Sequence, residues 1–290
     1  MHPAPSIILF TTLSGLGFGL LTFLGLNMPD VSDFILFASF VFAYALAGGG
    51  LIASTFHLGH PERSLRAFTQ WQTSWLSREA VLSVAALGTM GLYGVFAIFA
   101  DTKIAVLGWL GALLSVATVA ATSMIYAQLK TVPRWNHWST SALFVVLSLA
   151  GGGLLAAQTK VAAVFLAIAL GLQVYAFVSG DRRFRERGHT LNTATGLDHG
   201  TMRLFEPPHT GTNYLLKEMV HRVGRKHAIK LRVIGSAVGL ALPLVVVVAL
   251  PVGHVVGGLM VVLHVGGVLA LRWLFFAEAE HVVGLYYGKR

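Results

Sequence analysis

The chain has no cysteine. It therefore cannot hold an iron–sulfur cluster through thiolates, form a disulfide or attach haem covalently. If the chain handles electrons, their carrier must be a diffusible molecule, a haem held by histidines, or a cofactor in another subunit.

Charged residues are also scarce. They make up 11% of the 290 residues, and the mean hydropathy is +0.71. Eight apolar runs are each long enough to cross about 30 Å of hydrocarbon. These runs are residues 5–27, 33–56, 79–100, 104–128, 139–158, 161–180, 231–252 and 254–277. We therefore predict an all-α integral membrane protein, a bundle of about eight transmembrane helices in a single domain over residues 1–290.

The motif Gly15-x-x-x-Gly19 and the triplets Gly48–Gly50 and Gly151–Gly153 predict tight helix crossings.

Positive charge is nearly missing from one side of the expected bundle. The net charge is +9, and 18 of the 21 Lys and Arg residues fall in the termini and in alternate loops. The opposite side carries only Lys103 and Lys160, and Arg272 lies within the last run. Basic loops stay in the cytoplasm, so we expect both termini there. Charge beside membrane spans favours anionic lipid or a protein partner over nucleic acid.

One long polar loop, at about 181–230, is basic and contains eleven Lys or Arg residues up to Arg232. After Pro207-Pro208 it predicts an amphipathic helix from Tyr214 to His227. The loop is either an interfacial segment held by lipid or a docking surface for a peripheral subunit, and we favour docking. The residues expected to contact that partner are Arg182, Arg183, Arg185, Glu206, His209, Tyr214 and Lys217.

A second polar loop joins the second and third runs. His57 ends one run and Glu79 begins the next, so antiparallel packing should bring both to one membrane face. An imidazole and a carboxylate at headgroup depth can hydrogen-bond the oxygens of a quinone and carry its protons. Alternatively, both side chains cap helix ends and pair with Arg63 or Arg78. The other residues expected at a quinone site are His60, Arg63, Trp71, Trp75 and Arg78.

The run HLGHPERSLRAF, followed by WLSRE, resembles the signature loop of membrane anchor subunits of the dimethyl sulfoxide reductase family. TVPRWNHWST, at 131–140, resembles the loop between spans four and five of that anchor. The family belongs to a wider polysulfide- and nitrite-reductase-type group of quinone-reactive, haem-free membrane proteins. The resemblance implies a quinol site at His57 and Glu79, taking ubiquinone or menaquinone, and a place in the bacterial inner membrane.

The segment LFEPPHTGTNYLLKEM, at 204–219, departs from the short-looped anchors of that family. It is more similar to the membrane subunit of cytoplasm-facing sulfite-oxidising complexes. That similarity implies two partners, a molybdopterin catalytic subunit and a four-cluster ferredoxin-like iron–sulfur subunit. The same features leave open a quinol-oxidising anchor of a dimethyl sulfoxide reductase-type enzyme, an ion-translocating subunit and a purely structural tether.

Histidine and arginine inside the last run suggest two further sites. His254 and His264 lie ten residues apart on one helix and cannot clamp one haem between them, so we expect no haem. Arg272 is expected to reach Glu278 by snorkelling and to pair with it, or else to belong to a proton path or a quinone headgroup site. Trp135 and Trp138 are expected in an interfacial aromatic belt.

Overall fold

In a computed structural model, the described residues form eight helices that are long and apolar enough to span a membrane, as predicted. The structure describes residues 1–56, 60–197, 199–206, 209, 211–220 and 227–288. Seven spans are the single helices α1 (Pro5–Gly25), α2 (Asp33–Thr55), α3 (Trp75–Phe99), α4 (Ala105–Ala127), α5 (Trp138–Leu155), α6 (Thr159–Glu186) and α11 (His254–Ala277). The remaining span combines α9 (Ala228–Ser236), the π-helical turn η3 (Ala237–Ala241) and α10 (Leu242–Ala249). No strand occurs among the described residues.

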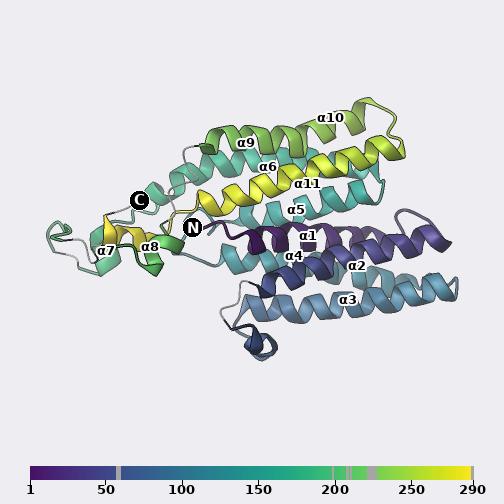
Figure 1. Ribbon diagram of the computed structural model, residues 1–290, viewed down its shortest axis with the longest axis horizontal. Coiled ribbons are helices and arrows are strands. Elements are labelled where there is room, and N and C mark those ends of the chain that lie inside the picture. The colour runs from purple at the N-terminus through teal and green to yellow at the C-terminus, as the bar shows by residue number, and fades with distance from the viewer. Residues whose placement is uncertain (57–59, 198, 207–208, 210, 221–226, 289–290) are drawn as a thin grey trace.

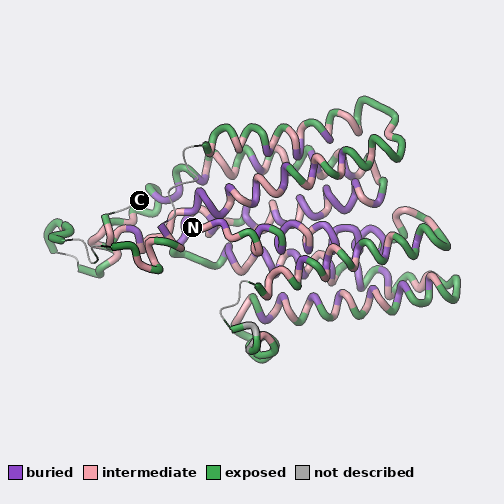
Figure 2. Tube along the Cα trace, in the orientation of Figure 1, coloured by how far each residue is buried: buried purple, intermediate pink, exposed green. Residues whose placement is uncertain are grey.

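Helix α1 is the centre of the bundle. It packs against α2, α4, α5 and α11, and its tube is mostly buried in Figure 2. A predicted close crossing is present between α1 and α5, because a side chain on Gly19 would collide with the Ser148 backbone and one on Gly152 with the Gly19 backbone. Van der Waals contact between such small residues drives helix association in lipid, where the hydrophobic effect is weak.

The other helices form two groups beside α1 (Figure 1). One group contains α5, α6, α9, α10 and α11. The other contains α2, α3 and α4, in which α3 packs along the whole of α4 but touches α2 at few points. This uneven packing leaves the facing ends of α2 and α3 free to border a pocket.

Both termini and the polar loops gather at one end of the bundle (Figure 1). Here lie the short helices η1 (Pro61–Phe68), α7 (Leu191–Thr195), α8 (Tyr214–Glu218) and η4 (Val282–Tyr287). The amide of His2 donates a hydrogen bond of 2.7 Å to Glu218, and that of Val282 donates one of 3.0 Å to Thr131. We call this assembly of loops and short helices the polar cap.

Three predicted helix boundaries are wrong. Helix α3 begins at Trp75, earlier than residue 79, because Ser74 caps its first turn through the Ser77 amide. Helix α6 continues past residue 180 to Glu186, so the first arginines of the long loop belong to a helix. Helix α8 ends at Glu218, and of the rest of the predicted helix, residues 221–226 lie outside the described chain.

Candidate functional site

A pocket of about 520 Å³ lies where α2 ends and α3 begins, beside η1. Its lining surface is mainly apolar, although six of its twelve residues carry a hydroxyl, imidazole or carboxyl group. It is lined by Leu51, Ser54, Thr55, His60, Ser64, Ala67, Phe68, Leu76, Glu79, Ala80, Ser83 and Val84. Apolar walls with a few polar groups are typical of sites for small organic molecules.

Glu79 is the most buried ionisable group of this pocket, with 4% of its surface exposed. Its Oε1 lies 2.5 Å from the Thr122 hydroxyl on α4, and that hydroxyl also lies 3.0 Å from the Thr118 carbonyl. A hydroxyl has one proton to donate and can still accept a hydrogen bond. Thr122 can therefore donate to an ionised Glu79. It can equally accept from a protonated Glu79 while donating to Thr118.

Ser77 holds the polar loop against α3. It is 1% exposed; its hydroxyl donates to the Ala67 carbonyl and accepts a 3.1 Å hydrogen bond from the Gln70 amide. A buried serine between two helices thus fixes η1 over the pocket.

Arg78 also holds the polar loop in place, from its outer side. Its Nε donates to the Trp71 carbonyl at 3.0 Å and its Nη2 to the Gln72 carbonyl at 2.6 Å. Its guanidinium also covers the Trp75 ring, 4.4 Å from the centroid. Arg78, Trp71 and Trp75, predicted at the quinone site, therefore shape the loop and do not line the pocket.

Of the seven residues predicted at this site, His60 and Glu79 line the pocket. His60 is exposed, and its Nδ1 lies 2.9 Å from Glu62 Oε1. His57 lies outside the described residues, as does the side chain of Arg63.

The pocket reaches the flank of the bundle. Val84 is 58% exposed and Leu76 is 48% exposed, although both line it. Large exposed apolar side chains beside a membrane span face lipid. A lipid-soluble molecule could therefore enter from the bilayer, while His60 lies toward the polar cap.

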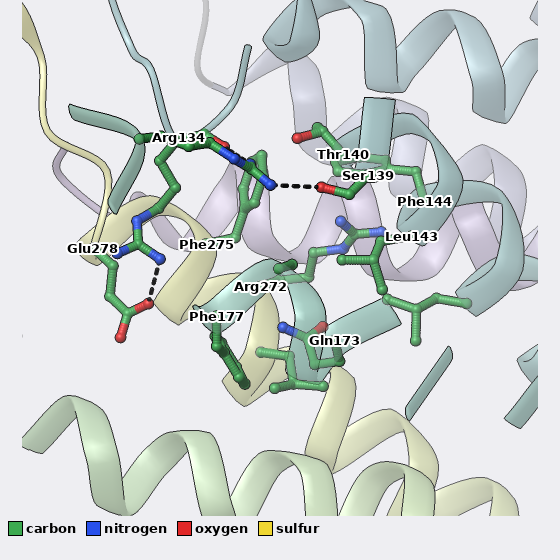
Figure 3. A pocket seen from close by; sticks show the side chains of 14 residues that line it. Arg134, Ser139, Thr140, Leu143, Phe144, Gln173, Phe177, Arg272, Phe275 and Glu278 are labelled. Carbon is green, nitrogen blue, oxygen red and sulfur yellow. Dashed lines mark hydrogen bonds and ion pairs between the residues drawn. The ribbon is translucent and has the colours of Figure 1, made fainter. Parts of the chain in front are cut away.

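A second polar cluster ties α6, α9 and α11 to the loop before α5. Arg232 binds Asp181 at 2.7 Å and Glu278 at 2.7 Å, and Arg134 binds the same two carboxylates. Figure 3 shows the Arg134–Glu278 pair at the edge of a cavity. The predicted pairing of Arg272 with Glu278 is thus wrong. Arg272 instead stacks on Phe144, 3.5 Å from the ring centroid.

The predicted docking residues divide into two groups. Arg183 is 7% exposed and donates to the Arg134 carbonyl, at 2.8 Å, and to two serine hydroxyls. It therefore stabilises this chain and is unavailable to a partner. The exposed members are Arg182, Arg185, Glu206, His209, Tyr214 and Lys217.

One of the two tryptophans expected in an aromatic belt, Trp135, is buried, and the belt position of Trp138 stays a prediction. Trp138 is 60% exposed, but Trp135 is 2% exposed and donates its indole N–H to the Phe275 carbonyl at 2.8 Å. Trp135 belongs to a buried aromatic cluster with Tyr126 and Phe276. Its core position follows from this partner on α11, which sequence spacing does not reveal.

Two comparisons with known proteins bear on the site. The family model described as DMSO reductase anchor subunit (DmsC) matches residues 1–183. A sulfite dehydrogenase subunit of Allochromatium vinosum is 30% identical, over 99% of this chain and 99% of that protein. The match to the family model includes the whole pocket and Thr122.

Proposed function

Because the chain belongs to the DMSO reductase anchor subunit family, we propose that this multi-pass membrane anchor of an oxidoreductase complex also exchanges electrons with quinone. It would pass electrons between a partner iron–sulfur subunit and quinone in the membrane. The observation that carries the proposal is the buried Glu79 carboxyl in a pocket that opens on the lipid-facing flank.

A quinone headgroup fits this pocket on three counts. About 520 Å³ lies within the range of small-molecule sites. The lipid-facing opening beside Leu76 and Val84 suits a molecule with an isoprenoid tail. The polar groups, Glu79 and His60 among them, suit carbonyl or hydroxyl oxygens.

Quinone reduction takes two electrons and two protons, and quinol oxidation releases them. Glu79 would hold or release one proton at its carboxyl group, since Thr122 can hydrogen-bond both of its protonation states. His60, exposed beside the polar cap, would exchange protons with water. His57 remains a predicted member of this site.

Because the chain lacks cysteine, it cannot hold an iron–sulfur cluster through thiolates. The electrons would therefore come from a cofactor in another subunit. We propose that a ferredoxin-like iron–sulfur subunit docks on the polar cap, with a molybdopterin subunit behind it. The exposed Arg182, Arg185 and Lys217 suit an acidic partner surface. The strongly basic composition of this end supports a cytoplasmic polar cap and insertion in a bacterial inner membrane.

The proposed substrate of the complex is sulfite, by similarity to the sulfite dehydrogenase protein of Allochromatium vinosum. Oxidation of sulfite with one water gives sulfate, two protons and two electrons. Those two electrons match the two that quinone accepts, so quinone would be reduced at the pocket.

The test compares Glu79→Gln with Asp101→Asn in membranes that contain the whole complex. Asp101 is an exposed carboxylate at the other end of the bundle, with φ 46°, a conformation that asparagine tolerates. Glu79→Gln should lower sulfite–quinone turnover about 100-fold or more, because a proton carrier is lost. Turnover with an artificial electron acceptor and membrane attachment of the partners should persist, and Asp101→Asn should resemble wild type. Equal quinone turnover in Glu79→Gln and Asp101→Asn would contradict the quinone reaction and would leave a purely structural tether as the function.

A further inference from the structure

A second, smaller cavity lies between α5, α6 and α11, in the other half of the bundle from the pocket (Figure 3). Its volume is about 50 Å³, too small for a quinone ring. A water molecule in liquid occupies about 30 Å³, so the cavity holds one or two particles of that size. Its polar lining consists of Arg134, Ser139, Thr140, Gln173, Arg183, Arg272 and Glu278.

Arg272 is the central group of this cavity. It is 5% exposed and sits inside a membrane span, with one face of its guanidinium on Phe144. Its Nε has no hydrogen-bond partner within the described chain. Glu278, the carboxylate of the cavity lining, is held by Arg134 and Arg232 instead.

The surroundings carry an excess of positive charge. Arg134 and Arg232 both pair with Asp181 and Glu278, and none of these ion pairs includes Arg183 or Arg272. Arg183 satisfies its hydrogen bonds with a carbonyl and serine hydroxyls, which carry no charge. Among the described residues, the Arg272 guanidinium beside the cavity has no carboxylate paired with it. A buried charge without a counter-charge is strongly destabilising, and more so at membrane depth.

The cavity also offers a neutral donor. Gln173 is 7% exposed, and its side chain lines the same cavity as Arg272 (Figure 3). An arginine edge and an amide N–H in one small space can both donate to the same anion.

We propose that this cavity binds a small monovalent inorganic anion of about the size of chloride, held by Arg272 and the Gln173 amide. The anion balances the buried guanidinium and thereby fixes the contact of α11 with α5 and α6. The site shares no lining residue with the pocket at Glu79, so it stands independently of the proposed quinone reaction.

The test uses the full chain purified in detergent with its co-purifying subunits. Its thermal midpoint is followed while chloride replaces gluconate at constant ionic strength. The wild type should gain about 4 °C by about 100 mM chloride, as expected for a ligand that binds only the folded state. Arg272→Gln should lose this gain, whereas Lys160→Gln, which removes an exposed cation, should keep it. The proposal would be overturned if chloride left the thermal midpoint of the wild type unchanged, or if it raised the midpoint of Arg272→Gln equally.

A second measurement needs no variant. Crystals of the wild-type protein soaked in bromide should show an anomalous peak in the cavity, beside the Arg272 guanidinium and the Gln173 amide. Bromide peaks confined to the protein surface would overturn the proposal, because the cavity would then contain water alone.

Discussion

Thr122 Oγ1 lies 2.5 Å from Glu79 Oε1, which joins α4 to the first turns of α3 inside the bundle. The same hydroxyl lies 3.0 Å from the Thr118 carbonyl within its own helix. Changing the protonation of Glu79 therefore requires only that the hydroxyl proton turn from one oxygen to the other. A buried carboxyl that must gain and lose protons needs such a partner, because a fixed donor would favour one form.

Replacement of Thr122 by valine should impair this exchange. Thr122→Val keeps the shape and removes the hydroxyl, so we expect quinone-linked turnover to fall about ten-fold. Thr122→Ser restores the hydroxyl and should recover most of the rate. Steady-state assays with quinone and with an artificial acceptor separate this effect from a loss of folded complex. Equal rates for valine and serine would show that the hydroxyl has no role in turnover.

The ion pairs of Glu278 should contribute measurably to stability. Its side chain is 6% exposed and accepts from Arg134 and Arg232, so Glu278→Gln leaves these two arginines with one shared carboxylate, Asp181. We expect a loss of about 2–4 kcal/mol in the free energy of unfolding. Chemical denaturation in detergent measures it.

Asp30 supplies the comparison for that prediction. Its ion pair with Lys103 lies at the opposite end of the bundle and is solvent-exposed, and Lys103 lowers the pKa of the Asp30 carboxyl. Asp30→Asn should leave the unfolding curve unchanged, because exposed pairs are screened by water. A similar loss in both variants would contradict the distinction between buried and exposed pairs.

Hydrophobic run length was enough to predict the eight spans, and an even number of spans brings both termini to one end. The cytoplasmic position of that end, inferred from loop charge, stays a prediction. The resemblance carried by HLGHPERSLRAF and WLSRE was confirmed by the family match. Glu79 was predicted because it is a lone acid beside an apolar run, a local signal. Thr122 was not predicted, because a threonine in an apolar helix looks like any other in the sequence. Only the packing of α3 against α4 brings its hydroxyl to Glu79.

The wrong predictions concern partners chosen by sequence proximity. Glu278 was assigned to Arg272, six residues away, but Arg232 reaches it from α9 and Arg134 from the loop before α5. Arg183 was placed in a basic loop, yet the extension of α6 turns it inward against Ser139. In both cases the partner lies far away in the sequence, so the local sequence could not predict the contact.

His137 should make stability depend on pH. It caps α5, where its Nδ1 accepts a 3.2 Å hydrogen bond from the Ser139 amide, and burial lowers its pKa, helped by Arg183 and Arg187. In the unfolded chain its pKa returns to about 6.5. As pH falls below about 6.5 the unfolded state binds this proton first, so stability decreases.

The variant His137→Asn keeps a capping side chain and does not titrate. Thermal midpoints at about pH 7.5 and about pH 5.5 should therefore differ less in His137→Asn than in wild type. An identical pH dependence in the two proteins would contradict a lowered pKa of His137 in the folded protein.

Charge on the exposed end of α6 should govern partner retention. The double variant Arg182→Glu with Arg185→Glu should release most of the iron–sulfur subunit at moderate salt, a loss of about ten-fold in retention. The chain itself should stay folded, since both side chains are exposed. Lys160→Glu, at the other end of the bundle, is the matched control. Pull-down from solubilised membranes measures how much iron–sulfur subunit is retained. Full retention would mean that the subunit does not dock on this end of α6.

The central claim, that quinone binds between α2 and α3, is tested most directly by photolabelling the intact complex with a short-tailed azidoquinone. We predict that the label attaches within residues 51–84, which contain the entire pocket lining, and that excess natural quinone prevents it. Glu79→Gln should weaken labelling without changing the level of the complex. Competed labelling found only in α5, α6 or α11, with none in residues 51–84, would contradict the claim.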